Sequence, residues 1–131
     1  MDELKPGLHA ELELTVTGDD TAAQWGSGLV PVYGTPALVG AMEQAAVMAL
    51  KKHLPVGQTT VGGHIAVDHL APTPVGMNVH IKAELLNVEG RKLTFFIEAW
   101  DETEKIGQAT HHRFVVNQFK FMEKVRSKGA K

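Results

Sequence analysis

An apolar segment in the first half of the chain has the spacing of a helix. Residues 36–50 read P-A-L-V-G-A-M-E-Q-A-A-V-M-A-L, and their apolar side chains cover most directions around a helix axis. Thr35 is predicted as the N-cap, and Pro36 fits the first helical position, where no backbone N–H is needed. Pro55 and Gly57 end the segment. The pattern therefore predicts one long, buried helix that starts at Thr35.

Alternation of polar and apolar residues predicts strands on both sides of this helix. The predicted strands are 9–16, 59–70, 77–88, 92–100 and 104–117. A glycine-rich loop is expected over 18–34, a hairpin turn over 87–91, and a short basic helix over 119–128. Consecutive strands with short turns favour an antiparallel sheet, and one long apolar helix can cover a face of it. The predicted fold class is α+β.

Composition narrows the class of protein. The length of 131 residues predicts one domain over 1–131, and 44% hydrophobic with 21% charged residues is typical of a soluble globular chain. A net charge of -2 gives no general attraction for nucleic acid. No cysteine is present, which excludes disulfides and cysteine nucleophiles and fits a reducing compartment. The polar N-terminus and the lack of a long apolar run predict a cytoplasmic protein with no membrane partner.

Two polar residues are predicted to face the apolar interior. Glu43 lies within the helix, on the side that also carries Val39, Ala46, Val47 and Leu50. His69 ends the helix-facing row of strand 59–70, because side chains alternate between the two faces of a strand. That row is Val61, Gly63, Ile65, Val67 and His69. Burying a lone carboxylate costs on the order of several kcal/mol, which a polar pocket shared by Glu43 and His69 would relieve.

Each of these residues also has a structural explanation. A buried Glu is commonly satisfied by a backbone group, a water or a symmetry mate, and an inward His is commonly structural. Thr35 can serve as a helix cap alone. Ionisable groups in unusual surroundings nevertheless cluster where chemistry is done, so their combination favours a reactive site.

No metal site or phosphate loop is predicted. His111 and His112 are adjacent, so they point to opposite faces of their strand, and His64 and His69 do the same on theirs. No set of His, Asp and Glu has metal-ligand spacing. A glycine-rich phosphate motif of the Walker or dinucleotide type is also absent from the sequence.

Five stretches of the chain together have a distinctive sequence and spacing. They are G-T-P-A-L-V-G-A-M-E, G-G-H-I-A-V-D-H-L-A-P-T-P-V-G, A-E-L-L-N-V-E-G-R-K-L, A-T-H-H-R and K-V-R-S-K. With them the sequence resembles the fluoroacetyl-CoA thioesterase family of hotdog-fold proteins over nearly its whole length. The resemblance implies an antiparallel sheet wrapped around one long central helix, assembly as a dimer, and hydrolysis of an acyl-CoA thioester.

The resemblance also implies roles for particular residues. The catalytic Thr, Glu and His of the family correspond to Thr35, Glu43 and His69. Gly62 corresponds to a glycine whose backbone N–H lies near the thioester in relatives. His111 and Arg113 match an H-x-R pattern to which the resemblance assigns no role.

The loop before the helix departs from the fluoroacetate-specific enzyme, which has a lid aromatic there. Leu29 stands at the matching position, and Trp25 and Tyr33 are out of register. A general short- or medium-chain acyl-CoA thioesterase is therefore expected. The candidate substrate-binding residues are Gly62, Gly63, Leu29 and Tyr33.

Helix geometry predicts how the site is assembled. Thr35 and Glu43 are eight residues apart, about 12 Å along one helix, so their side chains cannot bond within one subunit. We expect a site completed across the interface of a homodimer, or of a dimer of such dimers. CoA is part of the substrate, and no cofactor is expected. The cationic candidates for its phosphates are Arg91, Lys92, Arg113, Lys120, Lys124 and Arg126.

Several reactions stay open at this stage. Glu43 could act as a general base on water or attack the carbonyl, while His69 could polarise Thr35 or water and protonate the departing thiolate. Backbone N–H groups at the helix start could stabilise an oxyanion. The alternatives to a thioesterase are a hotdog hydratase or dehydratase, whose H-F-P-G signature is not present, and a non-catalytic acyl-CoA-binding or sensing domain.

Overall fold

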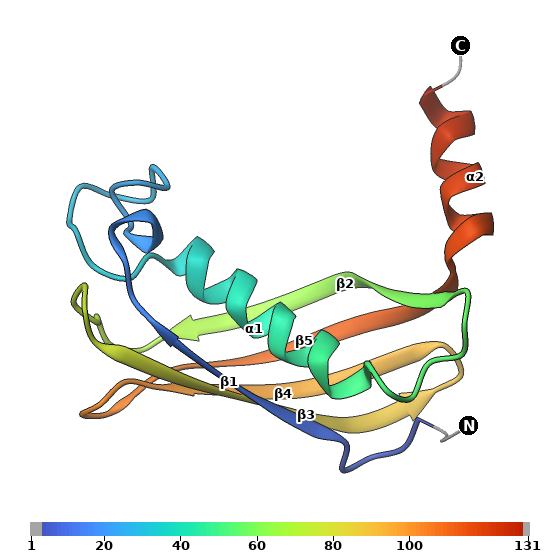
Figure 1. Cartoon of the computed structure of the whole chain (residues 1–131), viewed down its shortest axis with the longest axis horizontal. Helices are drawn as coiled ribbons and strands as arrows, with labels where there is room; N and C mark the ends of the chain where they lie inside the picture. Colours follow the sequence, from blue (N-terminus) through green and yellow to red (C-terminus); the bar gives the residue numbers. More distant parts are fainter. Residues whose placement is uncertain (1–3, 130–131) are drawn as a thin grey trace.

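A five-stranded antiparallel sheet with one long helix across a face forms the body of the molecule (Figure 1). The computed structural model describes residues 4–129. The elements are β1 (His9–Thr15), the 3-10 helix η1 (Gly18–Asp20), α1 (Thr35–Leu50), β2 (Gln58–His69), β3 (Asn78–Glu89), β4 (Lys92–Trp100), β5 (Lys105–Asn117) and α2 (Gln118–Gly129). The α+β class, all five strands and both helices are confirmed, and the helix η1 adds a turn within the predicted loop.

The order of strands across the sheet is β1-β3-β4-β5-β2. Strands β3, β4 and β5 occupy the middle, and their helix-facing side chains, such as Ile81, Phe95 and Ile97, are fully buried. Strand β2 pairs with β5 on one side, and its other edge has no strand partner among residues 4–129. Edge strands of this kind expose backbone groups that can pair with another chain.

The start of α1 differs from the prediction. Gly34 is the N-cap, with extended backbone angles, and Thr35 is the first residue of the helix. The chain needs a glycine here because a Cβ on Gly34 would lie 2.9 Å from the backbone of Ala22, while the Gly34 N–H donates to the Asp20 carbonyl at 2.8 Å. The prediction of Thr35 as the cap was wrong, which leaves its hydroxyl available for another contact.

Helix α1 is buried on one side only. Leu38, Met42, Ala45 and Ala46 are fully buried against the sheet. On the other side Val47 is 44% and Met48 39% exposed. The prediction of burial all around the helix was wrong for the isolated chain, because the sheet covers only one side of the helix and these two residues stay exposed on the other.

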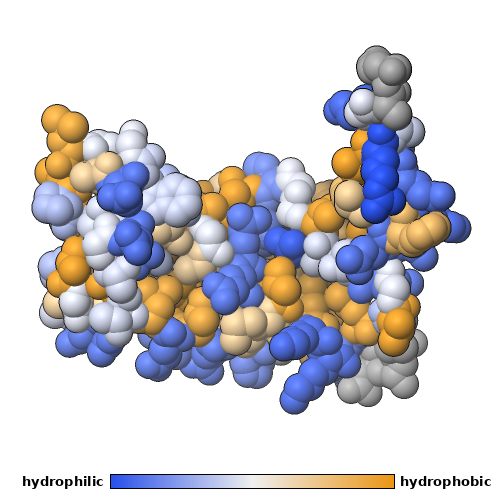
Figure 2. All heavy atoms as spheres, turned by 45° about the horizontal axis from the view of Figure 1, so that its top comes forward, coloured by the Kyte–Doolittle hydropathy of each residue, from blue (hydrophilic) through white to orange (hydrophobic). Residues whose placement is uncertain are grey.

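The C-terminal helix α2 stands away from the sheet (Figure 1). It continues directly from β5 and has no buried residue. Figure 2 shows hydrophilic side chains gathered where this helix rises. Within residues 4–129, neither α1 nor α2 is long and apolar enough to cross a membrane.

Candidate active site

Thr35 and His69 meet where the N-terminus of α1 lies beside the end of β2. The Thr35 Oγ1 and the His69 Nδ1 are 2.8 Å apart and share a hydrogen bond. Burial lowers the pKa of the His69 imidazole below its ordinary value, so the ring is held in the neutral form near pH 7. Its Nε2 is buried without a hydrogen-bond partner among the described residues. A hydroxyl next to a neutral imidazole is an arrangement that can move a proton.

A pocket of about 290 Å³ opens beside this pair. Thr35, His69 and Tyr33 line it together with Leu70 and Ala71. Tyr33 is buried, and this burial raises the pKa of its phenol. Of the two predicted substrate residues in the loop, Tyr33 therefore lies at the pocket. Leu29 is 96% exposed and is not among the residues that line it.

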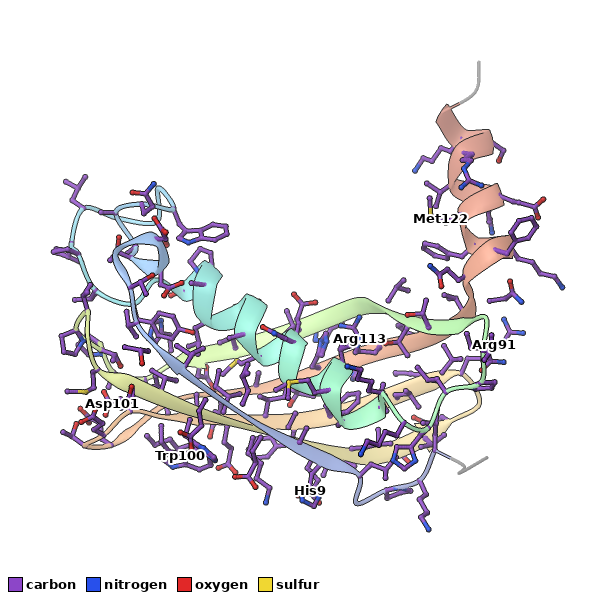
Figure 3. All side chains as sticks on the ribbon, viewed as in Figure 1. His9, Arg91, Trp100, Asp101, Arg113 and Met122 are labelled. Carbon is purple, nitrogen blue, oxygen red and sulfur yellow. The ribbon has the colours of Figure 1, made fainter. Side chains whose placement is uncertain are left out.

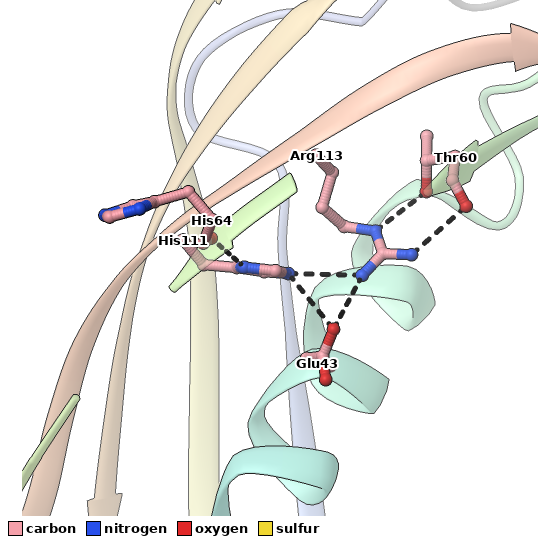
Figure 4. Close-up of polar contacts among 5 residues, drawn as sticks. All are labelled: Glu43, Thr60, His64, His111 and Arg113. Atoms are coloured by element: carbon pink, nitrogen blue, oxygen red, sulfur yellow. Dashed lines mark hydrogen bonds and ion pairs between the residues drawn. The ribbon is translucent and has the colours of Figure 1, made fainter. Parts of the chain in front are cut away.

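Glu43 belongs to a second polar cluster, one that Figure 4 shows in close-up. Its Oε2 lies 3.6 Å from Arg113 Nη1 and 4.0 Å from His111 Nε2. The Glu43 side chain is 40% exposed, so the predicted deep burial was wrong for a single chain. No hydrogen bond or ion pair joins it to Thr35 or His69 within residues 4–129.

Arg113 is fixed by a set of directed hydrogen bonds. Its Nε donates to Thr60 Oγ1 at 2.9 Å and its Nη2 to the Thr60 carbonyl at 3.1 Å. Its Nη1 donates to His111 Nε2 at 3.1 Å. The guanidinium is buried, and it points toward Glu43 without freedom to swing away (Figures 3 and 4).

The same bonds fix the protonation of His111. A guanidinium only donates, so Nε2 of His111 must accept, and the His64 carbonyl 2.7 Å from Nδ1 only accepts, so Nδ1 must carry the proton. His111 is therefore a neutral ring, in line with burial, which lowers its pKa. The contact with Glu43 is consequently not an ion pair, and Arg113 supplies the positive charge.

A bulge in β2 brings Glu43 next to Gly62. Gly62 pairs with Arg113 and His64 with His112, so Gly63 is the extra residue between two successive pairs. A Cβ on Gly62 would lie 2.8 Å from Glu43 Oε2, whereas one on Gly63 would meet the ring of Phe114.

The predicted facing of the two glycines was thus wrong, because the bulge between Gly62 and His64 shifts the alternation of side chains along β2 by one residue. Ile65 and Val67, beyond the bulge, pack against the core as predicted. The structure places Gly62, but not Gly63, against the polar cluster.

The sequence pattern did not predict the part played by Thr60 and by the His64 carbonyl. His111 and Arg113 matched a pattern to which no role was assigned. The available signal was their spacing of two, which places both side chains on one face of a strand. No three His, Asp or Glu side chains come close enough to hold a metal ion within the described part of the chain.

Comparisons with known proteins agree on one family. The family model for fluoroacetyl-CoA-specific thioesterase matches residues 16–119. A fluoroacetyl-CoA thioesterase of Streptantibioticus cattleyicolor is 43% identical over 97 residues, which are 74% of this chain and 70% of that protein.

Solved structures confirm the hotdog architecture. A structure of the fluoroacetyl-CoA thioesterase superposes with a TM-score of 0.91 at 34% identity. The match covers 97% of this chain and 98% of the chain in that structure. A hot-dog-like protein from Thermanaerovibrio acidaminovorans superposes with a TM-score of 0.89 at 25% identity. The match covers 95% of this chain and 93% of that protein.

Proposed function

Because the chain belongs to the family of fluoroacetyl-CoA-specific thioesterases, we propose that it hydrolyses an acyl-CoA thioester to a free acid and CoA. The observation that carries the proposal is the set of reactive groups: a Thr35 hydroxyl bonded to a neutral His69, and a Glu43 carboxylate held by Arg113. Thioester hydrolysis needs an activated nucleophile and a proton donor for the departing thiolate, and this set supplies both.

The proposed chemistry gives each group a role. The Glu43 carboxylate activates a water as general base or attacks the thioester carbonyl itself. His69, neutral because of its burial, takes up a proton that originates from the water, directly or relayed through the Thr35 hydroxyl, and passes it to the thiolate of CoA. Gly62 lacks a side chain beside the carboxylate, so the thioester can approach the backbone there. The reaction needs no cofactor, since CoA is part of the substrate.

The separation of Glu43 from the Thr35–His69 pair supports a homodimer with shared sites. The free edge of β2 and the half-exposed Glu43 lie on surfaces that a partner would cover. Two copies of β2 paired antiparallel about a twofold axis between Gly62 and His69 would bring the partner's His69 to Gly62 and Glu43.

Mixing two inactive variants tests the shared site. Glu43→Gln and His69→Ala chains, unfolded and refolded together, should regain about a quarter of wild-type activity, because half of the dimers are mixed and each mixed dimer has one intact site. A mixture that stays as inactive as its components, although light scattering shows dimers, would contradict the shared site.

The substrate class follows from the loop and the pocket. Leu29 takes the lid position and is almost fully exposed, so we propose a short- or medium-chain acyl group rather than fluoroacetyl alone. The lack of cysteine supports a reducing, cytoplasmic location.

A panel of acyl-CoA thioesters tests the reaction. Release of free CoA thiol is the expected result, and Glu43→Gln should lower kcat by about 10²-fold or more, the scale for an acid–base group. A change in the acyl chain without thiol release would indicate a hydratase, and binding without turnover would indicate a sensor. Unchanged turnover in a folded Glu43→Gln protein would refute the role of Glu43.

A further inference from the structure

A cationic groove lies where α2 leaves the sheet. It has a volume of about 380 Å³, and Arg91, Lys120 and Lys124 line it together with Gln58 and Phe121. No acidic side chain lines it, and none of the three cations forms an ion pair within residues 4–129. Figure 3 shows Arg91 near the root of α2. Three uncompensated positive charges around one hollow make a site for a ligand with several negative charges.

Packing does not explain the position of α2. The helix has no buried residue, and in the described part of the chain it meets the body of the molecule only at its root, beside β5 and through a hydrogen bond of 2.8 Å from the Gln118 N–H to the Gly57 carbonyl. Because α2 covers no core, the basic residues of this helix are not explained as the solvent-facing side of a core helix. The position of α2 does place Lys120 and Lys124, one turn apart, on the side of the helix that faces Arg91.

A second groove connects the cationic one to the proposed active site. It runs between α1 and the start of β2 and has a volume of about 430 Å³. Its lining is mostly apolar or uncharged, with one cation, and consists of Gln44, Val47, Met48, Lys51, Leu54, Gln58, Thr59 and Thr60. Gln58 lines both grooves. At the other end, Thr60 holds Arg113, which contacts Glu43. The surface thus passes from a carboxylate, through a partly apolar stretch that carries the single cation Lys51, to a cluster of three cations.

The length of this path matches the arm of CoA. Arg113 and Asn117 are four residues apart on β5, about 13 Å at the rise of an extended strand, and Asn117 lines the cationic groove. Twelve bonds join the sulfur of CoA to the first phosphate oxygen, as many as in four residues of polypeptide. The extended arm therefore spans roughly 13–14 Å.

We propose that the cationic groove binds the phosphates of CoA, with the pantetheine arm lying in the second groove and the thioester beside Glu43. Arg91 can engage a phosphate with two parallel N–H groups, while Lys120 and Lys124 act as point charges. The exposed ring of Phe121 offers the adenine a face to stack on. This subsite rests on the proposed thioesterase function, and it adds the residues that recognise the nucleotide end of the substrate.

The test compares two substrates with the same acyl group. Acyl-pantetheine has the reacting end of acyl-CoA but no phosphates. In the double variant Lys120→Ala/Lys124→Ala, the ratio of kcat/KM for acyl-CoA to that for acyl-pantetheine should fall by about 10²-fold, roughly tenfold for each lost charge-assisted contact. The matched control is Lys128→Ala, which removes a lysine from the same helix outside the groove and should leave the ratio unchanged.

Binding of adenosine 3′,5′-bisphosphate, measured by calorimetry, gives a readout that does not depend on turnover. The wild type and the Lys128→Ala protein should bind it, and the double variant should bind at least tenfold more weakly. If the double variant keeps both the wild-type ratio of kcat/KM values and the wild-type affinity for the bisphosphate, the proposed subsite is overturned, whether or not the protein hydrolyses acyl-CoA. Bisphosphate binding with no hydrolysis of any acyl-CoA would instead overturn the proposed function and leave the subsite in place.

Discussion

Adding a single methyl group at Gly62 tests the placement of the Glu43 carboxylate. The Cβ of Gly62→Ala would lie 2.8 Å from Glu43 Oε2 and 3.4 Å from both Arg113 Nη1 and His111 Cε1. The last two distances are tight but tolerable, whereas the first is too short for a non-bonded contact of a Cβ atom. Because Arg113 and His111 are fixed by their own hydrogen bonds, the group that must move is the carboxylate at the end of the flexible Glu43 side chain.

The size of this movement sets the expected effect. Oε2 must retreat by about 0.6 Å to reach an ordinary contact of 3.4 Å. Displacements approaching 1 Å in a catalytic group cost up to about 10²-fold in rate, so we expect kcat to fall by about 10- to 100-fold. The backbone of β2 and its pairing with β5 are unchanged, and a displaced flexible side chain costs little folding energy. The melting temperature should therefore stay within a few degrees of wild type.

Gly40→Ala is the matched control, because Gly40 lies on the helix that carries Glu43 and its added Cβ would meet nothing within 4 Å. It should retain kcat and gain up to about 1 kcal/mol in stability, as Ala is the better helix former. Thiol release under saturating acyl-CoA, together with thermal unfolding, measures both variants. A folded Gly62→Ala protein with kcat within twofold of wild type would refute the close approach of the carboxylate to this strand.

Three further predictions concern the groups around the site. Thr35→Ala should lower kcat by about 10-fold or more, whereas Thr35→Ser should not, because only the hydroxyl contacts His69. Gly34, not Thr35, caps the helix, so urea unfolding of either variant should not show the loss of about 1 kcal/mol that is typical of a removed cap. Arg113→Lys should destabilise the fold by about 1–3 kcal/mol in the same assay, since a lysine cannot make the forked bonds to Thr60 and His111. The free energy of unfolding should be greatest at a pH above the ordinary pKa of histidine and should fall as the pH drops below about 6.5. Burial lowers the pKa of His69 and His111 in the folded state, so the unfolded chain binds protons first as the pH falls. A melting temperature that stays constant from about pH 8 to 5 would contradict this.

The periodicity of the sequence predicted the elements because each is long enough to show its repeat. Strand β4 was placed at its observed bounds, and the others within a residue or two. The helix cap was misassigned because the preference for Thr is a local tendency, whereas Gly34 is required by the approach of the distant Ala22 backbone. Such a contact between segments leaves no mark on the local pattern.

The polar cluster was not predictable from alternation alone. An extra residue in β2 reverses the facing of every residue on one side of it, and here the extra residue is Gly63, next to Gly62. Glycines have no side chain whose polarity would reveal the reversal. The prediction consequently held beyond the bulge, at Ile65 and Val67, and failed at the two glycines.

The cluster around Arg113 explains why an apolar helix carries a carboxylate. A buried guanidinium without a counter-ion is costly, and Glu43 is the carboxylate that faces it. The Oε2 of Glu43 thus balances the charge of Arg113 in the folded protein, while the exposed part of the carboxylate can contact a substrate or a partner. Glu43→Gln separates the two functions, because an amide oxygen can still accept from Arg113 while the charge is lost. A loss of turnover larger than the accompanying loss of stability would therefore assign the charge itself to the chemistry.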